Sequence, residues 1–70
     1  MEPAEQFASN LRSARDRAGL SQEELSNRSG LHSTEISRLE RGVREPRLGT
    51  IVRLARGLGL APADLLAGVR

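Results

Sequence analysis

The sequence predicts an all-α fold, a compact bundle of five short helices. Apolar residues recur at three- and four-residue spacing, which places them on one face of each helix. Polar side chains that cap helix starts and glycines that end helices separate these apolar segments. No segment alternates apolar and polar residues as a half-buried strand does. Each helix is therefore located from its apolar face and its ends.

The first predicted helix has an apolar face of large and small side chains. Its members are Phe7, Ala8, Leu11, Ala14 and Ala18. Gly19 follows at the position where a left-handed residue ends a helix. We expect the helix to end there and its apolar face to contribute to the core.

The second predicted helix begins with a capping box. Ser21 is followed three residues later by Glu24, and in this arrangement each side chain bonds the backbone N–H of the other residue. The helix then runs to about Ser29, with Leu25 as its clearest core residue. Gly30 supplies the turn that follows.

The third predicted helix is short and opens on small polar side chains. We expect Ser33 to be its N-cap. Ile36 and Leu39 are three residues apart and point inward. The helix reaches about Arg41, and a glycine directly after it stops it.

A fourth helix is expected from about residue 48 or 49 to residue 58, after a basic loop of residues 42–47. Its inward face is Ile51, Leu54, Ala55 and Leu58. Pro62 is then the first residue of a short fifth helix, because proline is favoured at that position. We expect this helix to bring Leu65 and Leu66 to the core.

The length and composition indicate one domain, residues 1–70, with its core in about residues 7–66. A chain this short buries only about 60% of the surface that its unfolded form exposes, so each core residue matters. It has no Cys and a single His, and we expect no disulfide, metal or cofactor. No apolar run approaches the roughly 20 residues of a membrane helix. The N-terminus has no signal pattern, so we expect a cytoplasmic protein.

Catalytic residue patterns are missing from the sequence. There is no Cys nucleophile, no His, Asp and Glu cluster with metal-ligand spacing, and no Gly-rich phosphate loop. Basic charge is instead concentrated at Arg38, Arg41, Arg44 and Arg47, whereas most acids precede this segment. The position of the charge is more informative than the net value of +2. We predict a binding protein and not an enzyme.

The order of these features resembles the Cro/repressor-type helix-turn-helix family (lambdoid repressor-like, xenobiotic-response-element type). The resemblance is carried by Gly19-Leu20-Ser21-Gln22-Glu23-Glu24-Leu25, Gly30, Ile36-Ser37-Arg38-Leu39-Glu40-Arg41-Gly42, Pro46 and Leu54-Ala55. It covers about residues 7–66. It implies a lambda-repressor-like domain of five helices with the helix-turn-helix motif at about residues 21–40. It also implies a sequence-specific regulator of transcription that binds double-stranded DNA, and we expect a repressor.

The resemblance places four residues at the base edges of the major groove. They are Ser33, Thr34, Ser37 and Arg38, with His32 just before the helix. Arg38 is the strongest candidate, because a guanidinium can bond O6 and N7 of one guanine. Glu35 has two interpretations: it accepts from a cytosine amino group, or it repels a phosphate. Thr34 and Glu35 also suit the first turn of a helix for structural reasons alone.

Phosphate contacts are implied for a second set of residues. They are Gln22, Arg15, Arg41, Arg44 and Arg47. Gln22 matches a family position at a helix start, where free backbone N–H groups favour an anion. Alternatively, Arg47 enters the minor groove, because a narrow minor groove attracts arginine. Glu45 lies in the same loop and opposes phosphate binding there.

The resemblance also implies an ion pair and a dimer. Arg15 and Glu40 match positions that pair beneath the DNA-facing surface, where Glu40 would hold Arg15 toward a phosphate. We expect a homodimer, at least on DNA, on a palindromic operator. The chain stops soon after the fifth helix, so dimerisation is expected to use the helical domain itself. Candidate contacts are Val52, Leu60, Ala61 and Pro62, although the same residues suit the core.

Two alternatives remain open at the level of the sequence. The same fold serves antitoxins and restriction–modification controller proteins, for which a toxin or another regulator is a protein partner. It also serves as a protein-interaction module. Exposed apolar surface favours a protein partner, and arginines around a polar helix favour DNA.

Overall fold

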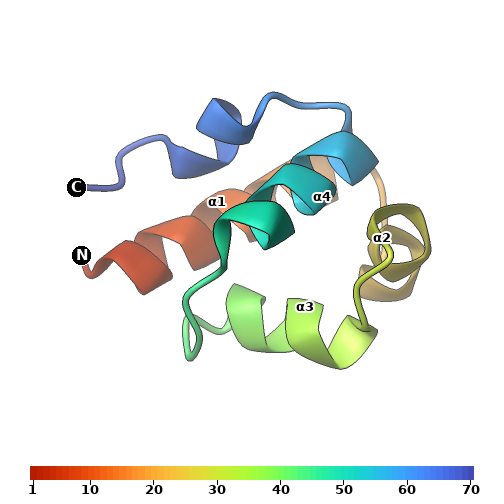
Figure 1. Ribbon diagram of the computed structural model, residues 1–70, viewed down its shortest axis with the longest axis horizontal. Coiled ribbons are helices and arrows are strands. Elements are labelled where there is room, and N and C mark those ends of the chain that lie inside the picture. The colour runs from red at the N-terminus through yellow and green to blue at the C-terminus, as the bar shows by residue number, and fades with distance from the viewer.

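The computed structural model describes residues 1–70 and contains four α-helices and one 3₁₀ helix, with no strand (Figure 1). The α-helices are α1 (Pro3–Arg17), α2 (Gln22–Ser29), α3 (Ser33–Glu40) and α4 (Leu48–Leu58), and the 3₁₀ helix is η1 (Pro62–Leu66). Both termini lie at the same end of the molecule (Figure 1). The all-helical prediction is confirmed, and the prediction of five α-helices is wrong at the last element.

The capping box predicted at the start of α2 is present. The Ser21 hydroxyl accepts from the Glu24 N–H at 3.0 Å, and the Glu24 carboxylate accepts from the Ser21 N–H at 2.9 Å. The backbone bond, and after it the hydroxyl, lowers the pKa of the Glu24 carboxyl below its ordinary value. At the other end, Gly30 has φ 77°, the left-handed conformation that glycine adopts without strain.

The N-cap of α3 differs from the prediction. His32, with ψ 143°, is the N-cap, and Ser33 is the first helical residue. The first helical bond runs from the Ile36 N–H to the His32 carbonyl at 3.1 Å. Leu31 is 8% exposed and its N–H donates to the Ser29 hydroxyl at 3.2 Å. Because this buried leucine fixes the turn, α3 begins one residue earlier than a serine cap predicts.

The fifth predicted helix is a 3₁₀ helix, although it begins at Pro62 as expected. The segment is only five residues long, and Ala67 directly after it has ψ 126°, outside the helical region. The Asn10 side-chain amide donates to the carbonyls of Leu65 at 2.9 Å and Ala67 at 2.8 Å. These bonds from α1 satisfy carbonyls at the end of the element, which have no partner within a helix.

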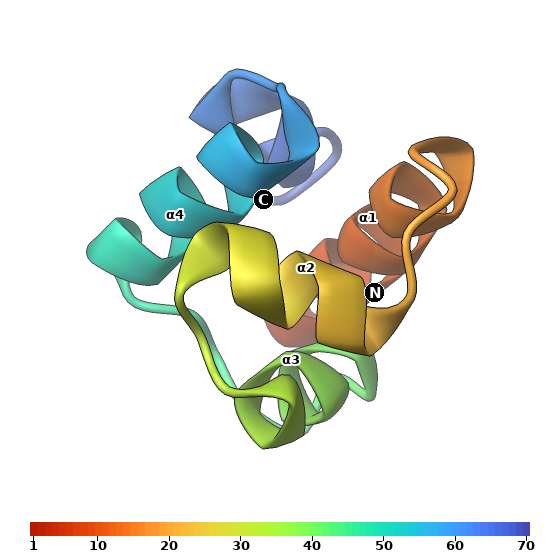
Figure 2. The ribbon, with the colours of Figure 1, turned by 90° about the vertical axis from the view of Figure 1, so that its right-hand side faces the viewer.

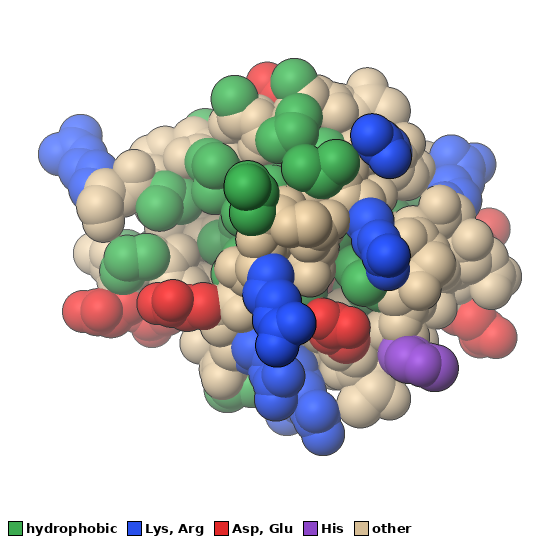
Figure 3. Space-filling model, viewed as in Figure 1, with side chains coloured by type: hydrophobic (Ala, Val, Ile, Leu, Met, Phe, Trp, Pro, Cys, Tyr) green, Lys and Arg blue, Asp and Glu red, His purple; other side chains and the backbone are tan.

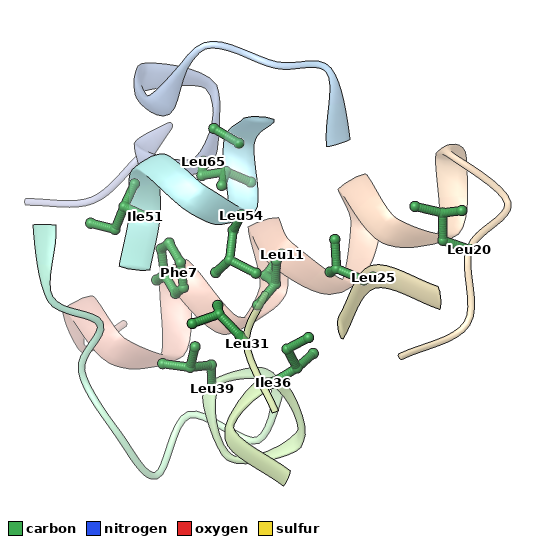
Figure 4. Packing of buried hydrophobic residues seen from close by; sticks show 11 residues of the cluster. Phe7, Leu11, Leu20, Leu25, Leu31, Ile36, Leu39, Ile51, Leu54 and Leu65 are labelled. Carbon is green, nitrogen blue, oxygen red and sulfur yellow. The ribbon is translucent and has the colours of Figure 1, made fainter. Parts of the chain in front are cut away.

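The core contains eleven buried hydrophobic residues from all five elements and from two connections (Figure 4). They are Phe7, Leu11, Leu20, Leu25, Leu31, Ile36, Leu39, Ile51, Leu54, Ala55 and Leu65. Leu20 and Leu31 lie between helices, so helical periodicity did not predict them. Ala18, expected in the core, is exposed at the C-cap of α1. Leu66, also expected there, is 37% exposed.

The helix α2 packs against both α3 and α4 (Figure 2). At Gly57, an added Cβ would lie 3.3 Å from Leu25 Cδ1 and 3.4 Å from Arg28 Cβ. The absence of a side chain at Gly57 therefore lets α4 approach α2 closely. The helix α3 packs against α1 and α2 at the outer edge of the molecule, where Figure 2 shows it below α2.

Replacing Leu25 by alanine should destabilise the fold by about 2–5 kcal/mol, because a fully buried leucine loses its contacts and leaves a cavity. Urea unfolding followed by circular dichroism measures this loss. Leu48, which is 76% exposed, provides the matched control, and Leu48→Ala should change stability by less than about 0.5 kcal/mol. Equal losses in the two variants would show that Leu25 is not a core residue.

Replacing Glu24 by glutamine should lower stability at neutral pH and have little effect in acid. The pKa of Glu24 is lower in the folded chain, so its carboxylate stabilises the fold above its ordinary pKa of about 4.3. This contribution is lost as the pH falls through the lower folded pKa. Urea unfolding of both proteins between neutral pH and about pH 3 measures the difference. A difference that stays constant over this range would show that the cap does not stabilise the charged carboxylate.

Candidate nucleic-acid interface

One face of α3 is buried and the opposite face is polar and exposed. Ile36 and Leu39 are fully buried. Ser33, Thr34 and Arg38 are exposed, and Ser37, another predicted base-facing residue, is half-buried. His32 is exposed beside them. This face of α3 offers hydroxyl groups and a guanidinium to a partner.

A hollow of about 510 Å³ lies between α3 and the segment that leads into α4. Its charged or polar lining includes Thr34, Glu35 and Arg38 from α3, and Arg44, Glu45 and Arg47 from the connecting segment. In the view of Figure 3, blue arginine side chains gather at the lower centre of the molecule, with an acidic side chain and the single His beside them. The fold thus brings three of the predicted DNA-binding arginines to one concave surface.

The remaining predicted phosphate contacts do not line this hollow. Arg41 is exposed at the C-terminal end of α3, where its Nε donates to the Ser37 carbonyl at 3.4 Å. Gln22 is the first residue of α2 and is half-buried. Arg15 lies on α1 and its side chain is 17% exposed.

The Glu40 carboxylate joins three helices beneath this surface. Glu40 is 3% exposed. Arg15 Nε donates to Glu40 Oε2 at 2.6 Å and Arg15 Nη2 donates to Oε1 at 2.9 Å. Gln22 Nε2 donates to the same Oε1 at 3.1 Å. The hydrogen bond to Glu40 raises the pKa of Arg15 above its ordinary value.

Two further bonds from α1 support this arrangement. Arg15 Nη1 donates to the Leu20 carbonyl at 2.9 Å. Arg12 Nη1 donates to the backbone carbonyl of Glu40. Arginines one turn apart on α1 therefore hold both the side chain and the backbone at the C-terminal end of α3. The sequence carried no signal for the bonds made by Gln22 and Arg12, because their partners are far away along the chain.

The polar face of α3 and the adjacent hollow are the candidate site, because they bring the predicted base-facing residues together with Arg44 and Arg47. None of the helices combines the length and apolar character needed to span a membrane. No three His, Asp or Glu side chains lie close enough together to hold a metal ion.

Comparison with known proteins identifies a family and relatives of this chain. A family model described as helix-turn-helix matches residues 11–65. The uncharacterized HTH-type transcriptional regulator y4dL of Sinorhizobium fredii is 46% identical over 70 residues, which cover 94% of this chain and 36% of that protein. The chain thus spans about a third of the length of y4dL. The control protein C.SmaI of Serratia marcescens is 42% identical over 66 residues, covering 94% of this chain and 79% of C.SmaI.

Solved structures give the same result for the fold. The restriction–modification controller protein C.AhdI from Aeromonas hydrophila has a TM-score of 0.86 and 39% sequence identity, covering 89% of this chain and 94% of C.AhdI. The clp gene regulator ClgR from Corynebacterium glutamicum has a TM-score of 0.90 and 30% identity, covering 96% of this chain and 71% of ClgR. These similarities extend over nearly the whole chain.

Replacing Arg15 by methionine should destabilise the fold by about 3 kcal/mol, because it leaves the buried Glu40 carboxylate without its main partner. Arg17→Met is the matched control, since Arg17 is exposed on the same helix. The double variant Arg15→Met with Glu40→Gln should regain part of the loss. Urea unfolding measures all three, and an Arg15→Met protein as stable as Arg17→Met would contradict the structural role of the pair.

Proposed function

Because the chain belongs to the helix-turn-helix family, we propose that it is a transcriptional regulator that binds a specific double-stranded DNA sequence. The observation that carries the proposal is the exposed polar face of α3 beside a hollow lined by three arginines. An α-helix fits the major groove, where the pattern of donors and acceptors differs for each base pair. In this proposal α3 is the recognition helix and α2 crosses the DNA backbone.

The base contacts come from the N-terminal part of α3. Ser33 and Thr34 lie in its first turn, and Ser37 and Arg38 follow one turn later. Arg38 discriminates most strongly, because its fork recognises guanine. The hydroxyl groups of the other three residues can accept or donate a hydrogen bond, so they discriminate less between bases.

The phosphate contacts surround this reading face. Arg41, Arg44 and Arg47 follow α3 and neutralise the backbone on one side, and Gln22 bonds it at the start of α2. Arg15 has five N–H donors, of which three are used within the protein. The other two are left for a phosphate, and Glu40 holds the guanidinium in place.

The protein acts as a homodimer on a palindromic operator, and most simply as a repressor. An apolar groove supports a dimer: Leu66 is 37% exposed and lines a groove of about 350 Å³ together with Pro46, Val69 and neighbouring residues. Figure 3 shows green hydrophobic side chains gathered in the upper half of the face in view. The dimer candidates Leu60, Ala61 and Pro62 are exposed and Val52 is half-buried.

A restriction–modification controller is the second candidate within the same DNA-binding function. The similarity to C.SmaI and C.AhdI favours it. A restriction enzyme gene beside the gene for this chain would support that role. Its absence would favour a regulator of other promoters.

Selection from a random pool of duplexes should enrich a palindromic sequence with half-sites about 34 Å apart, because a two-fold dimer reads successive major grooves. Failure to enrich any sequence, with binding near the non-specific level of about 10⁻⁴–10⁻⁶ M, would contradict the proposed function.

Two arginine variants should then separate base reading from phosphate binding. Arg38→Ala should relax one base position at a cost of about 1–3 kcal/mol. Arg44→Ala should weaken binding to all duplexes and reduce the salt slope by about 1. Arg17→Ala, which removes the same charge from an exposed position outside the hollow, is the control. Fluorescence anisotropy across a salt series measures the affinity of each variant for each duplex. An unchanged base preference in Arg38→Ala would refute the assignment of Arg38 as a base-reading residue.

A further inference from the structure

Glu35 occupies an unusual position for an acid on this surface. It lies in the first turn of α3, between the exposed Thr34 and the buried Ile36, and is itself half-buried. Its side chain lines the hollow together with Arg38 from its own helix and with Arg44 and Arg47 from the opposite wall. A carboxylate is therefore placed among the groups that the proposed function assigns to DNA.

The Glu35 carboxylate is not engaged by these arginines. Both ion pairs in the structure involve Arg15: it is hydrogen-bonded to Glu40, and its Nη1 lies 3.7 Å from Asp16 Oδ1. Glu40 is buried and receives three side-chain hydrogen bonds, whereas Glu35 is in neither pair. An ionised carboxylate only accepts hydrogen bonds, so Glu35 has open acceptor capacity directed to whatever fills the hollow.

A DNA duplex would meet this carboxylate with one of two kinds of group. A phosphate oxygen is also negative, and its approach to Glu35 is repulsive while water is being excluded. An exocyclic amino group, such as N4 of cytosine, is a donor that a glutamate accepts. A half-buried carboxylate that loses water without gaining a donor is costly. Complexes that present an amino group to Glu35 are therefore favoured over those that do not.

We propose that Glu35 is a specificity-determining residue that weakens binding to duplexes lacking a base amino group at its position in the major groove. The inference rests on the proposed DNA-binding function and goes beyond it by assigning discrimination to an acid. Specificity is a difference between two affinities, and a repulsive group raises it by lowering the affinity for incorrect sites. The three surrounding arginines attract every duplex. Glu35 limits which duplex sequences bind tightly.

A purely structural role makes a different prediction. Glu35 is in the first turn of α3, where a negative charge stabilises the helix through its dipole. Loss of that effect would lower the stability of the fold and the affinity for all duplexes by the same factor. It would leave the ratio of specific to non-specific affinity unchanged.

The test compares Glu35→Gln with two variants that remove the same charge. Glu45→Gln changes the exposed acid on the other wall of the hollow, and Asp64→Asn changes an exposed acid on η1. Each protein is titrated with the duplex that the wild-type protein selects and with a scrambled duplex of the same length. Each is also put through the selection from random duplexes, and urea unfolding establishes that it is folded. Glu35→Ala provides a second variant at the same position.

In Glu35→Gln and Glu35→Ala, the ratio of the affinity for the selected duplex to that for the scrambled duplex should fall about tenfold. The fall should come mainly from tighter binding of the scrambled duplex. The selected sequence should lose its preference, at one position, for a base that presents an amino group in the major groove. In Glu45→Gln and Asp64→Asn the two affinities should rise together. An unchanged ratio at Glu35, or an equal fall in the controls, would overturn the inference and leave the proposed function intact. A wild-type protein that selects no sequence would instead remove the proposed function and this inference with it.

Discussion

The placement of α3 depends on how one buried charge is compensated. Glu40 is almost inaccessible to water, and a carboxylate in such a position is stable only when it is paired and hydrogen-bonded. Arg15 from α1 and Gln22 from α2 supply the donors. Since the bonds come from two other helices, satisfying this charge fixes the C-terminal end of α3 relative to both. The hydrophobic contacts of Ile36 and Leu39 then set which face of α3 remains outside.

This constraint links stability to DNA recognition. A recognition helix must present its side chains at a fixed height and angle, and a 70-residue chain has a small core with which to hold it. The N-terminal turn of α3 is not part of this anchor, and Ser33 and Thr34 in it are exposed. Among the residues proposed to contact phosphate, Arg15 and Gln22 belong to the anchor, whereas the arginines that follow α3 do not. Within α3 itself, the buried pair is made by Glu40 and the proposed base contacts are made by other residues.

Local features were predictable from the sequence and contacts between helices were not. The capping box of Ser21 and the bounds of α4 followed from side-chain chemistry and periodicity within a few residues. The cap of α3 was misplaced because the burial of Leu31, a tertiary effect, decides where the turn ends. The fifth element was expected to be a short helix and is a five-residue 3₁₀ helix, whose end is held by Asn10, far away in the sequence. The pairing of Arg15 with Glu40 was expected only from the family resemblance, and the bond from Gln22 had no signal in the sequence.

The most direct test of the central claim is to observe which protein atoms touch the bases. An NMR study of the labelled protein bound to its selected duplex measures contacts between side-chain protons and base protons in the major groove. We predict contacts from Thr34 and Arg38 on α3, with the Glu40 anchor unchanged between the free and bound protein. Contacts from η1 or from the apolar groove beside Leu66, with none from α3, would contradict the assignment of α3 as the recognition helix.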